Sequence, residues 1–384
     1  MVVAAARVAV ALALCAATTV SHASAAHDRV RSVVDGAVKP VMEKYRIPGM
    51  AVGIIADGQT HFLNYGVAST QTGKPVTTDT LFELGSISKT FTATLAAYAQ
   101  IGGYLSLSEP AGKFLSGLRG CKFGDVTLLD LGTHTAGGLP LQVPDDVRND
   151  QQLMTYLQRW RPAYPPGTMR TYSNIGIGML GVITAKSMGE PFDALVEHDL
   201  FSPLGMTSSY FNVPQIVMTD YAQGYTSEGA PIRMAPGVLS TQAYGVKSTA
   251  PDMLRFLEAN MDMLPLDAKL QHAITDTHTG YFTAGVLTQD LIWEQYRYPP
   301  ELATLREGNS PSMIYNSNAA TKITPAQEPR PDVWIDKTGT TNGFAAYVAF
   351  VPERQLGIVM LANKSIPIDA RVMAAYAILT SLDR

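Results

Sequence analysis

A serine and a lysine three positions apart, Ser86 and Lys89, stand at the start of a helical sequence pattern that continues to Gln100 and stops at Gly102. Residues at this spacing share one face of a helix, so the hydroxyl and the amine lie within reach of each other. Backbone N–H groups at a helix N-terminus also favour developing negative charge. The pair therefore predicts a serine nucleophile with its own base, although S-x-x-K alone is common by chance and requires companions.

Two companion motifs lie far from this pair in the chain. Tyr172-Ser173-Asn174 falls between a loop that contains proline and glycine and a long apolar run, which places its polar side chains at the end of a loop over a buried helix. Lys337-Thr338-Gly339-Thr340 lies in one strand of a predicted hairpin. Each motif alone also fits an ordinary surface loop or an edge strand. The three together, in this order and in these contexts, indicate one shared site.

Sheet-forming sequence at both ends of the chain predicts the elements that position these motifs. After a predicted helix from His27 to Tyr45, two strands from Met50 to Ala56 and from Thr60 to Ala68 alternate around a hairpin turn at Asp57-Gly58. Helix and loop patterns follow. The far end is predicted to form three strands and a closing helix, at Asp332 to Thr338, Phe344 to Val351, Gln355 to Leu361 and Asp369 to Leu382.

This order of elements predicts an α/β domain in two pieces, with an all-α domain inserted between them. We assign residues 26–85 and 310–384 to the α/β domain, an antiparallel sheet flanked by helices. Residues 86–309 are assigned to a mainly helical domain with long loops. Small-molecule sites often lie between domains, so the three motifs are expected to meet in the cleft.

The first 25 residues have the pattern of a cleaved secretory signal peptide. A basic Arg7 precedes an apolar core from Val8 to Ala17, and Ala23-Ser24-Ala25 is an A-x-A cleavage site. The core is too short for a membrane anchor. Lipidation at Cys15 is not favoured, because the bulky Leu14 precedes it. We therefore expect a periplasmic protein with no membrane partner.

Removal of this segment leaves Cys121 as the only cysteine, so no intramolecular disulfide is possible and the fold must depend on its core. The formal net charge of the whole chain is −4, and no basic cluster is present. This charge predicts no general attraction to nucleic acid. We expect a monomer that acts on a small molecule.

The three motifs together resemble the serine β-lactamases of class C, the cephalosporinases of the penicillin-binding-protein-like superfamily. The S-D-N signature of class A is absent, and Tyr172-Ser173-Asn174 stands in its place. The resemblance implies a β-lactamase/transpeptidase-like fold. It also implies hydrolysis of the β-lactam amide of cephalosporins and penicillins through an acyl-serine, and hence antibiotic resistance. The likeness continues at Ile47 to Val52, Gly137 to Pro144, Pro203 to Thr207, Ala243 to Lys247 and Ala370 to Val372.

The resemblance assigns roles to individual residues. Ser86 is the nucleophile, and Lys89 and Tyr172 are the proton carriers, with the primary base left open between them. Lys337 is the fourth catalytic residue. Backbone N–H groups of Ser86 and Thr340 would form the oxyanion hole. Tyr244 would form a wall of the pocket, or merely pack. The substrate-binding residues that the resemblance implies are Gln142, Asn174, Tyr244, Thr338, Gly339 and Thr340.

One position departs from the family pattern. Ile368 stands where many class C enzymes carry an asparagine near the substrate carboxylate, and an apolar side chain cannot donate a hydrogen bond there. The carboxylate would then depend more on Lys337, Thr338 and Thr340.

The histidines give no sign of a metal site, because the seven of them contain no H-x-H or H-E-x-x-H spacing. We therefore expect no metal and no cofactor, and interpret His134 as structural. Two alternatives remain open. The first is an esterase or D,D-peptidase on the same scaffold, although such esterases often lack the K-T-G element. The second is a penicillin-binding sensor that is acylated without turnover, although no tether or signalling domain is predicted here.

Overall fold

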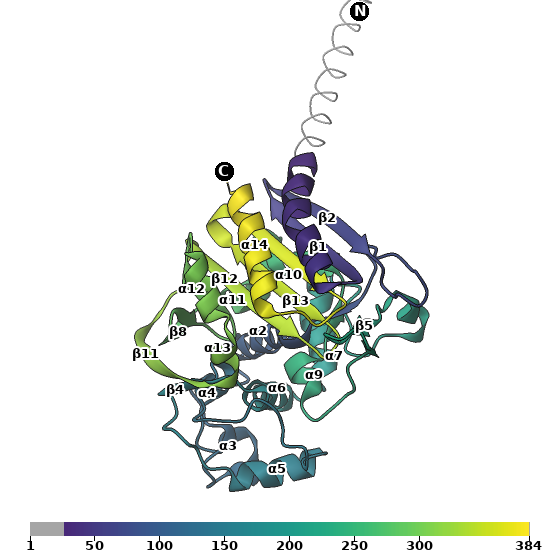
Figure 1. The fold of residues 1–384 in the computed structure, drawn as a ribbon. Helices are drawn as coiled ribbons and strands as arrows, with labels where there is room; N and C mark the ends of the chain where they lie inside the picture. Colours follow the sequence, from purple (N-terminus) through teal and green to yellow (C-terminus); the bar gives the residue numbers. More distant parts are fainter. Residues whose placement is uncertain (1–26, 384) are drawn as a thin grey trace, which may run out of the picture.

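The computed structural model describes residues 27–383, and the predicted signal peptide lies outside them. One ten-stranded antiparallel sheet runs through the molecule, in the order β2-β1-β14-β13-β12-β10-β9-β8-β11-β4 (Figure 1). Its strands are β1 (Gly49–Ala56), β2 (Gln59–Gly66), β4 (Met169–Thr171), β8 (Gly280–Ala284), β9 (Leu287–Gln289), β10 (Glu294–Arg297), β11 (Ser317–Gln327), β12 (Val333–Thr340), β13 (Ala345–Val351) and β14 (Leu356–Ala362).

The sheet is built from chain segments that are remote in sequence. β1 pairs with β14 along most of its length, with Met50 opposite Ala362 and Ile55 opposite Gly357. β12, which carries the K-T-G motif, pairs with β13 on one side and with β10 on the other. The N-terminal hairpin is therefore joined directly to the C-terminal part of the sheet.

Alternating side chains of β1 bury themselves on opposite faces of the sheet, as the period of a strand requires. Met50, Val52 and Ile54 pack with the helix over residues 27–45 and with α14 (Ile368–Leu382). Ala51 and Ile55 pack on the other face, in the cluster that includes α10 (Ala250–Asn260). Figure 1 shows the helix 27–45 and α14 lying side by side over the sheet.

A third apolar cluster holds the helical part together. α2 (Ser88–Ile101) packs against α6 (Asn174–Met188) in this cluster, and shorter helices surround the pair. The shorter helices of this cluster are α3 (Ala111–Phe114), α4 (Leu128–Gly132), α5 (Asp150–Arg159), α9 (Ser240–Tyr244) and α11 (Ala268–Asp276). α7 (Phe192–Val196) and α8 (Ser202–Leu204) pack in the cluster of α10, and α12 (Leu302–Gly308) and α13 (Pro311–Tyr315) pack in the cluster of α14.

Two small sheets of two strands each lie outside the main sheet. β3 (Phe82–Glu83) pairs with β7 (Lys247–Ser248), and β5 (Gly224–Tyr225) pairs with β6 (Pro231–Ile232). Among residues 27–383, no helix is long and apolar enough to cross a membrane. Turns of 3-10 helix lie at Gly85–Ile87, Ser116–Leu118, Gln215–Asp220 and Pro352–Arg354. One π-helical turn lies at Glu197–Phe201.

The predicted fold class, an antiparallel sheet flanked by helices together with a helical part, is confirmed. The turn at Asp57-Gly58 has φ values of 52° and 69°, the left-handed pair that a tight hairpin requires. The strands β8 to β10 were not predicted, although they lie in the range 86–309 and belong to the main sheet. They have only three to five residues each, too few for a strand period to stand out in the sequence. The division at residues 85 and 310 stays a prediction.

Candidate active site

Ser86 lies in the 3-10 turn Gly85–Ile87, between β3 and α2. Gly85 has a φ of 53°, and a Cβ there would lie 2.6 to 2.8 Å from the backbone N, O and C atoms of Thr340. Only glycine allows the turn to approach β12 this closely. The sequence therefore brings the S-x-x-K turn against the K-T-G strand.

Lys89 points back from the first turn of α2 to the serine. Its Nζ donates to Ser86 Oγ over 2.8 Å and to the carbonyl of Ala243 over 2.9 Å, and the side chain is fully buried. Burial lowers the pKa of Lys89 to about 8, with help from the charge of Lys337 and against the opposing effect of Tyr172. A neutral amine beside the hydroxyl is therefore accessible near neutral pH.

Tyr172 ends the loop before α6, as predicted. Ser173 caps that helix by accepting hydrogen bonds from the backbone N–H groups of Ile175 and Gly176 over 3.1 and 3.2 Å. The buried hydroxyl of Tyr172 makes no hydrogen bond of ordinary geometry with any residue that the structure describes. This cap fixes the backbone next to Tyr172.

Two ammonium groups flank the tyrosine. Lys337 Nζ and Lys89 Nζ lie 5.1 and 5.3 Å from the centroid of the Tyr172 ring. Burial raises the pKa of Tyr172, but the charges of Lys337 and Lys89 outweigh it and lower the value to about 8. Burial alone would lower the pKa of Lys337. Tyr172 and Glu294 outweigh burial, so the pKa of this lysine is raised overall. Lys337 is therefore a fixed cation beside two groups that can exchange a proton.

The predicted amide-binding pair is also brought together. Asn174 Nδ2 donates to Gln142 Oε1 over 2.9 Å, and the backbone N–H of Asn174 donates to the carbonyl of Leu141 over 2.9 Å. The carbonyl oxygen Oδ1 of Asn174 is buried with no partner among the described residues. This pair therefore presents a free acceptor next to Tyr172. Tyr244 is half-buried at the end of α9, next to the Ala243 carbonyl that holds Lys89.

Arg371 is a residue of this site to which sequence analysis gave no role. From α14 its buried guanidinium donates Nη1 to the carbonyls of Gly339 and Ala346, the latter over 2.7 Å, and Nη2 to Thr340 Oγ1 over 2.9 Å. It therefore holds the end of the K-T-G strand. The one basic residue of a mainly apolar helix was the signal available in the sequence.

His134 and Ile368 both pack. Nδ1 of His134 accepts from the backbone N–H of Ser173 over 3.2 Å, and its ring centroid lies 4.3 Å from that of Tyr172. Burial lowers the pKa of His134 well below its ordinary value, so the ring is neutral and supports Tyr172. Ile368, the first residue of α14, is half-buried against the apolar cluster under that helix.

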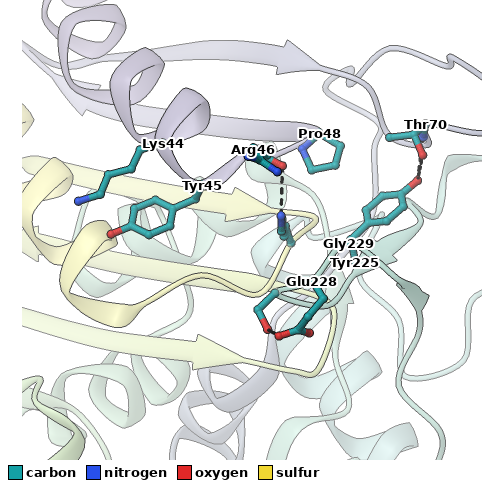
Figure 2. A pocket seen from close by; sticks show the side chains of 10 residues that line it. Lys44, Tyr45, Arg46, Pro48, Thr70, Tyr225, Glu228 and Gly229 are labelled. Carbon is teal, nitrogen blue, oxygen red and sulfur yellow. Dashed lines mark hydrogen bonds between the residues drawn. The ribbon is translucent and has the colours of Figure 1, made fainter.

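A separate pocket of about 540 Å³ contains none of these residues (Figure 2). The Tyr225 hydroxyl lies 2.9 Å from Thr70 Oγ1, and Lys364 Nζ donates to the carbonyl of Arg46 over 3.5 Å. The S-x-x-K, Y-S-N and K-T-G motifs all lie outside the lining of this pocket. Its lining is Lys44, Tyr45, Arg46, Pro48, Thr70, Tyr225, Ser227, Glu228, Gly229 and Lys364.

The fold and the cluster of Ser86, Lys89, Tyr172 and Lys337 define a serine acyl-transfer protein. Comparison with known proteins specifies it further. The sequence model of the Beta-lactamase family matches residues 34–382, and the chain belongs to that family. A β-lactamase from Lysobacter lactamgenus is 51% identical over 346 residues, which cover 90% of each chain.

Solved structures agree. The chain is similar to a D-alanine carboxypeptidase from Burkholderia cenocepacia, with 57% identity and a TM-score of 0.89 over 92% of this chain and 99% of that one. It is also similar to a class C β-lactamase in complex with cefoxitin, with 49% identity and a TM-score of 0.90 over the same shares of the two chains. The predicted resemblance to class C β-lactamases is therefore confirmed.

Proposed function

We propose that this chain hydrolyses the β-lactam amide of cephalosporins and penicillins through an acyl-Ser86 intermediate, and so gives resistance to these antibiotics. The observation that carries the proposal is the buried Lys89 ammonium 2.8 Å from Ser86 Oγ, in one cluster with Tyr172 and Lys337. Family membership and the similar class C enzymes support the same conclusion.

Acylation forms a bond between Ser86 Oγ and the lactam carbonyl carbon and breaks the bond between that carbon and the ring nitrogen. The serine proton passes to Lys89 or Tyr172, both with a pKa of about 8, and from there to the leaving nitrogen. Backbone N–H groups of Ser86 and Thr340 stabilise the oxyanion. In deacylation Tyr172 takes a proton from the water that frees the serine.

The remaining residues hold the substrate. Asn174 and Gln142 bind its side-chain amide, since they lie together at the N-terminus of α6. The cationic Lys337, with Thr338 and Thr340, binds its carboxylate. Gly339 lets the strand approach the serine turn, because a Cβ there would lie 2.0 Å from the Leu84 carbonyl oxygen.

Steady-state turnover of a chromogenic cephalosporin by the purified mature chain tests this proposal. We expect sustained hydrolysis without added metal, and Ser86→Ala should abolish both hydrolysis and covalent labelling by penicillin. A stoichiometric burst without further turnover would instead identify a penicillin-binding sensor. Labelling that persists in the Ser86→Ala variant would remove the serine from its role.

A D,D-carboxypeptidase is a second candidate activity, because a solved structure 57% identical to this chain is described as a D-alanine carboxypeptidase. The same nucleophile can attack a peptide carbonyl, with D-alanine as the leaving group. Release of D-alanine from a peptide ending in D-Ala-D-Ala measures this activity. A kcat/KM for the peptide above that for cephalosporins would make it the principal function.

We also propose that the first 25 residues are a signal peptide and that the mature chain is a periplasmic monomer. The A-x-A site at Ala23-Ser24-Ala25 supports cleavage after Ala25. Only six large apolar side chains are exposed among residues 27–383, which supports a monomer. N-terminal sequencing of protein from the periplasmic fraction and light scattering in solution test the two statements.

A further inference from the structure

Glu83 is a buried acid three residues before the nucleophile, at the end of β3. Its Oε2 accepts from the hydroxyl of Thr341 over 2.5 Å. Its Oε1 accepts from the hydroxyl of Tyr221 over 2.5 Å and from the backbone N–H of Met234 over 2.8 Å. One carboxyl group therefore joins three segments that are remote in sequence: the nucleophile turn, the end of the K-T-G strand and the long loop around residues 212–237.

The position of this contact matters because the two N–H groups of the proposed oxyanion hole come from different segments. Ser86 follows Glu83 in the nucleophile turn, and Thr340 immediately precedes Thr341. Glycines let the two segments touch, since Gly85 lies against the Thr340 backbone and Gly339 against Leu84. Within residues 27–383, the Glu83–Thr341 bond is the hydrogen bond that joins residues 81–87 to the strand end 337–341.

The carboxyl group is itself held from the opposite side. Tyr221 stacks on Phe344 with ring centroids 6.3 Å apart, and the Arg233 guanidinium lies 4.1 Å from the centroid of the Tyr221 ring. The Tyr221 hydroxyl and the Met234 N–H thus meet Oε1, while Oε2 is left to Thr341. The hydroxyls of Tyr221 and Thr341 form hydrogen bonds of equal length to the Glu83 carboxyl group. Of the two, only the bond from Thr341 joins the two segments that carry the oxyanion donors.

We propose that Glu83 is a positioning residue, which sets the separation of the Ser86 and Thr340 N–H groups by holding Thr341. Donors to an oxyanion act only when they are fixed before the charge develops. The role rests on the proposed function, because it takes Ser86 and Thr340 as the oxyanion donors. Glu83 itself touches no substrate.

A matched pair of variants tests this role. Thr341→Val and Tyr221→Phe each delete one hydroxyl from the same carboxyl group, so they remove similar hydrogen bonds. We expect Thr341→Val to lower the acylation kcat/KM for a cephalosporin about 10-fold, less than the roughly 10²–10³-fold loss when an oxyanion donor is deleted outright. Tyr221→Phe is expected to stay within about two-fold of the wild type. Thr341→Ser, which restores the hydroxyl, should recover the lost rate.

Phenylboronic acid gives a second readout, because its tetrahedral serine adduct mimics the transition state. In Thr341→Val the inhibition constant of phenylboronic acid should rise by the same factor as kcat/KM falls. The melting temperatures of Thr341→Val and Tyr221→Phe should be similar. Equal losses in both variants, or no loss in Thr341→Val, would overturn the inference. Wild-type protein that neither hydrolyses nor is acylated by β-lactams would contradict the proposed function instead, and boronate binding would still report on Glu83.

Discussion

At the residue scale, the proposed site places two groups of lowered pKa, Tyr172 and Lys89, beside the cation Lys337. Tyr172 and Lys89 both have a pKa of about 8, and both values lie below the ordinary ones. The causes differ: neighbouring positive charge outweighs burial for the tyrosine, whereas burial dominates for the lysine. Because the charge on each group changes the pKa of the other, Tyr172 and Lys89 titrate as a coupled pair. The apparent pKa values therefore belong to the pair, and so does the role of base.

The charge argument predicts a tyrosine that ionises early. Titration followed by tyrosinate absorbance should show one transition near pH 8 that is missing in Tyr172→Phe. Burial raises the pKa of Tyr65 and Tyr221, so these ionise at higher pH. Lys337→Met removes a charge that favours the tyrosinate and should shift the midpoint upward. An unchanged midpoint in that variant would show that Lys337 does not tune the tyrosine.

Deletion of the Tyr172 hydroxyl alone should be costly. Tyr172→Phe keeps the ring between the two ammonium groups and removes only the proton carrier. We expect kcat for a cephalosporin to fall by roughly two to four orders of magnitude, the usual range for a positioned general acid or base. Steady-state kinetics measures this directly. Turnover within a few-fold of the wild type would leave Lys89 as the base.

Ile368 tests whether this chain lacks a carboxylate donor. Ile368→Asn at the start of α14 should lower KM with little change in kcat, because the new contact would be equal in ground and transition states. The expected gain corresponds to the roughly 0.5–1.5 kcal/mol of one hydrogen bond. Both constants should be measured for one cephalosporin and one penicillin. An unchanged KM for both would mean that Ile368 serves only to pack against the cluster under α14.

At the element scale, close approach of the serine turn to β12 depends on glycine. Gly85→Ala should lower kcat/KM more than about 100-fold, because Thr340 would have to move and a displacement of about 1 Å can cost that much. Gly103→Ala is the matched control, since Gly103 has a φ of 74° with nothing within 4 Å of the added Cβ. That variant carries backbone strain alone, and its kcat/KM should match the wild type.

Elements with strong local signals were predictable from sequence, and those fixed by tertiary contacts were not. The hairpin β1–β2, the strands β12 to β14 and α14 appear within about two residues of the predicted bounds, because alternation and turn residues marked them. β9 has three residues, and β11 is polar with a proline inside it. Both form because neighbouring strands supply partners.

The same distinction applies to the site. Ser86 and Lys89 are three residues apart on one turn, so their contact follows from the sequence alone. The meeting of Tyr172 with Lys337 followed from the order and context of the three motifs and from the family resemblance, not from local spacing. The partners of Glu83, by contrast, come from loops whose path no local pattern specifies.

At the scale of the whole molecule, Arg170 joins the segment of the tyrosine to the sheet. From β4 its buried guanidinium donates to Glu294 Oε1 and Gln289 Oε1, each over 2.6 Å, and to the Met313 carbonyl over 2.7 Å. Burial makes this ion pair costly to break, because the remaining charge cannot be hydrated.

Loss of the carboxylate should therefore destabilise the fold. Glu294→Gln should reduce the free energy of unfolding by about 3–5 kcal/mol, measured by urea denaturation. Asp332→Asn is the control, since it breaks an exposed pair with Arg330 and should leave the urea midpoint unchanged. Equal midpoints for the two variants would mean that the buried pair is not needed.

The pairing of β1 with β14 sets the order in which the sheet can form. β1 is followed directly in the chain by one of its partners, β2, but its other partner is β14, the last strand. Met50 can therefore pair with Ala362 only after β14 has been synthesised. During synthesis the inner edge of β1 therefore stays open until almost the whole chain has been made, and an open strand edge can pair with another molecule. Folding of this molecule is consequently a late event, with the greatest risk of aggregation just before the last strand arrives.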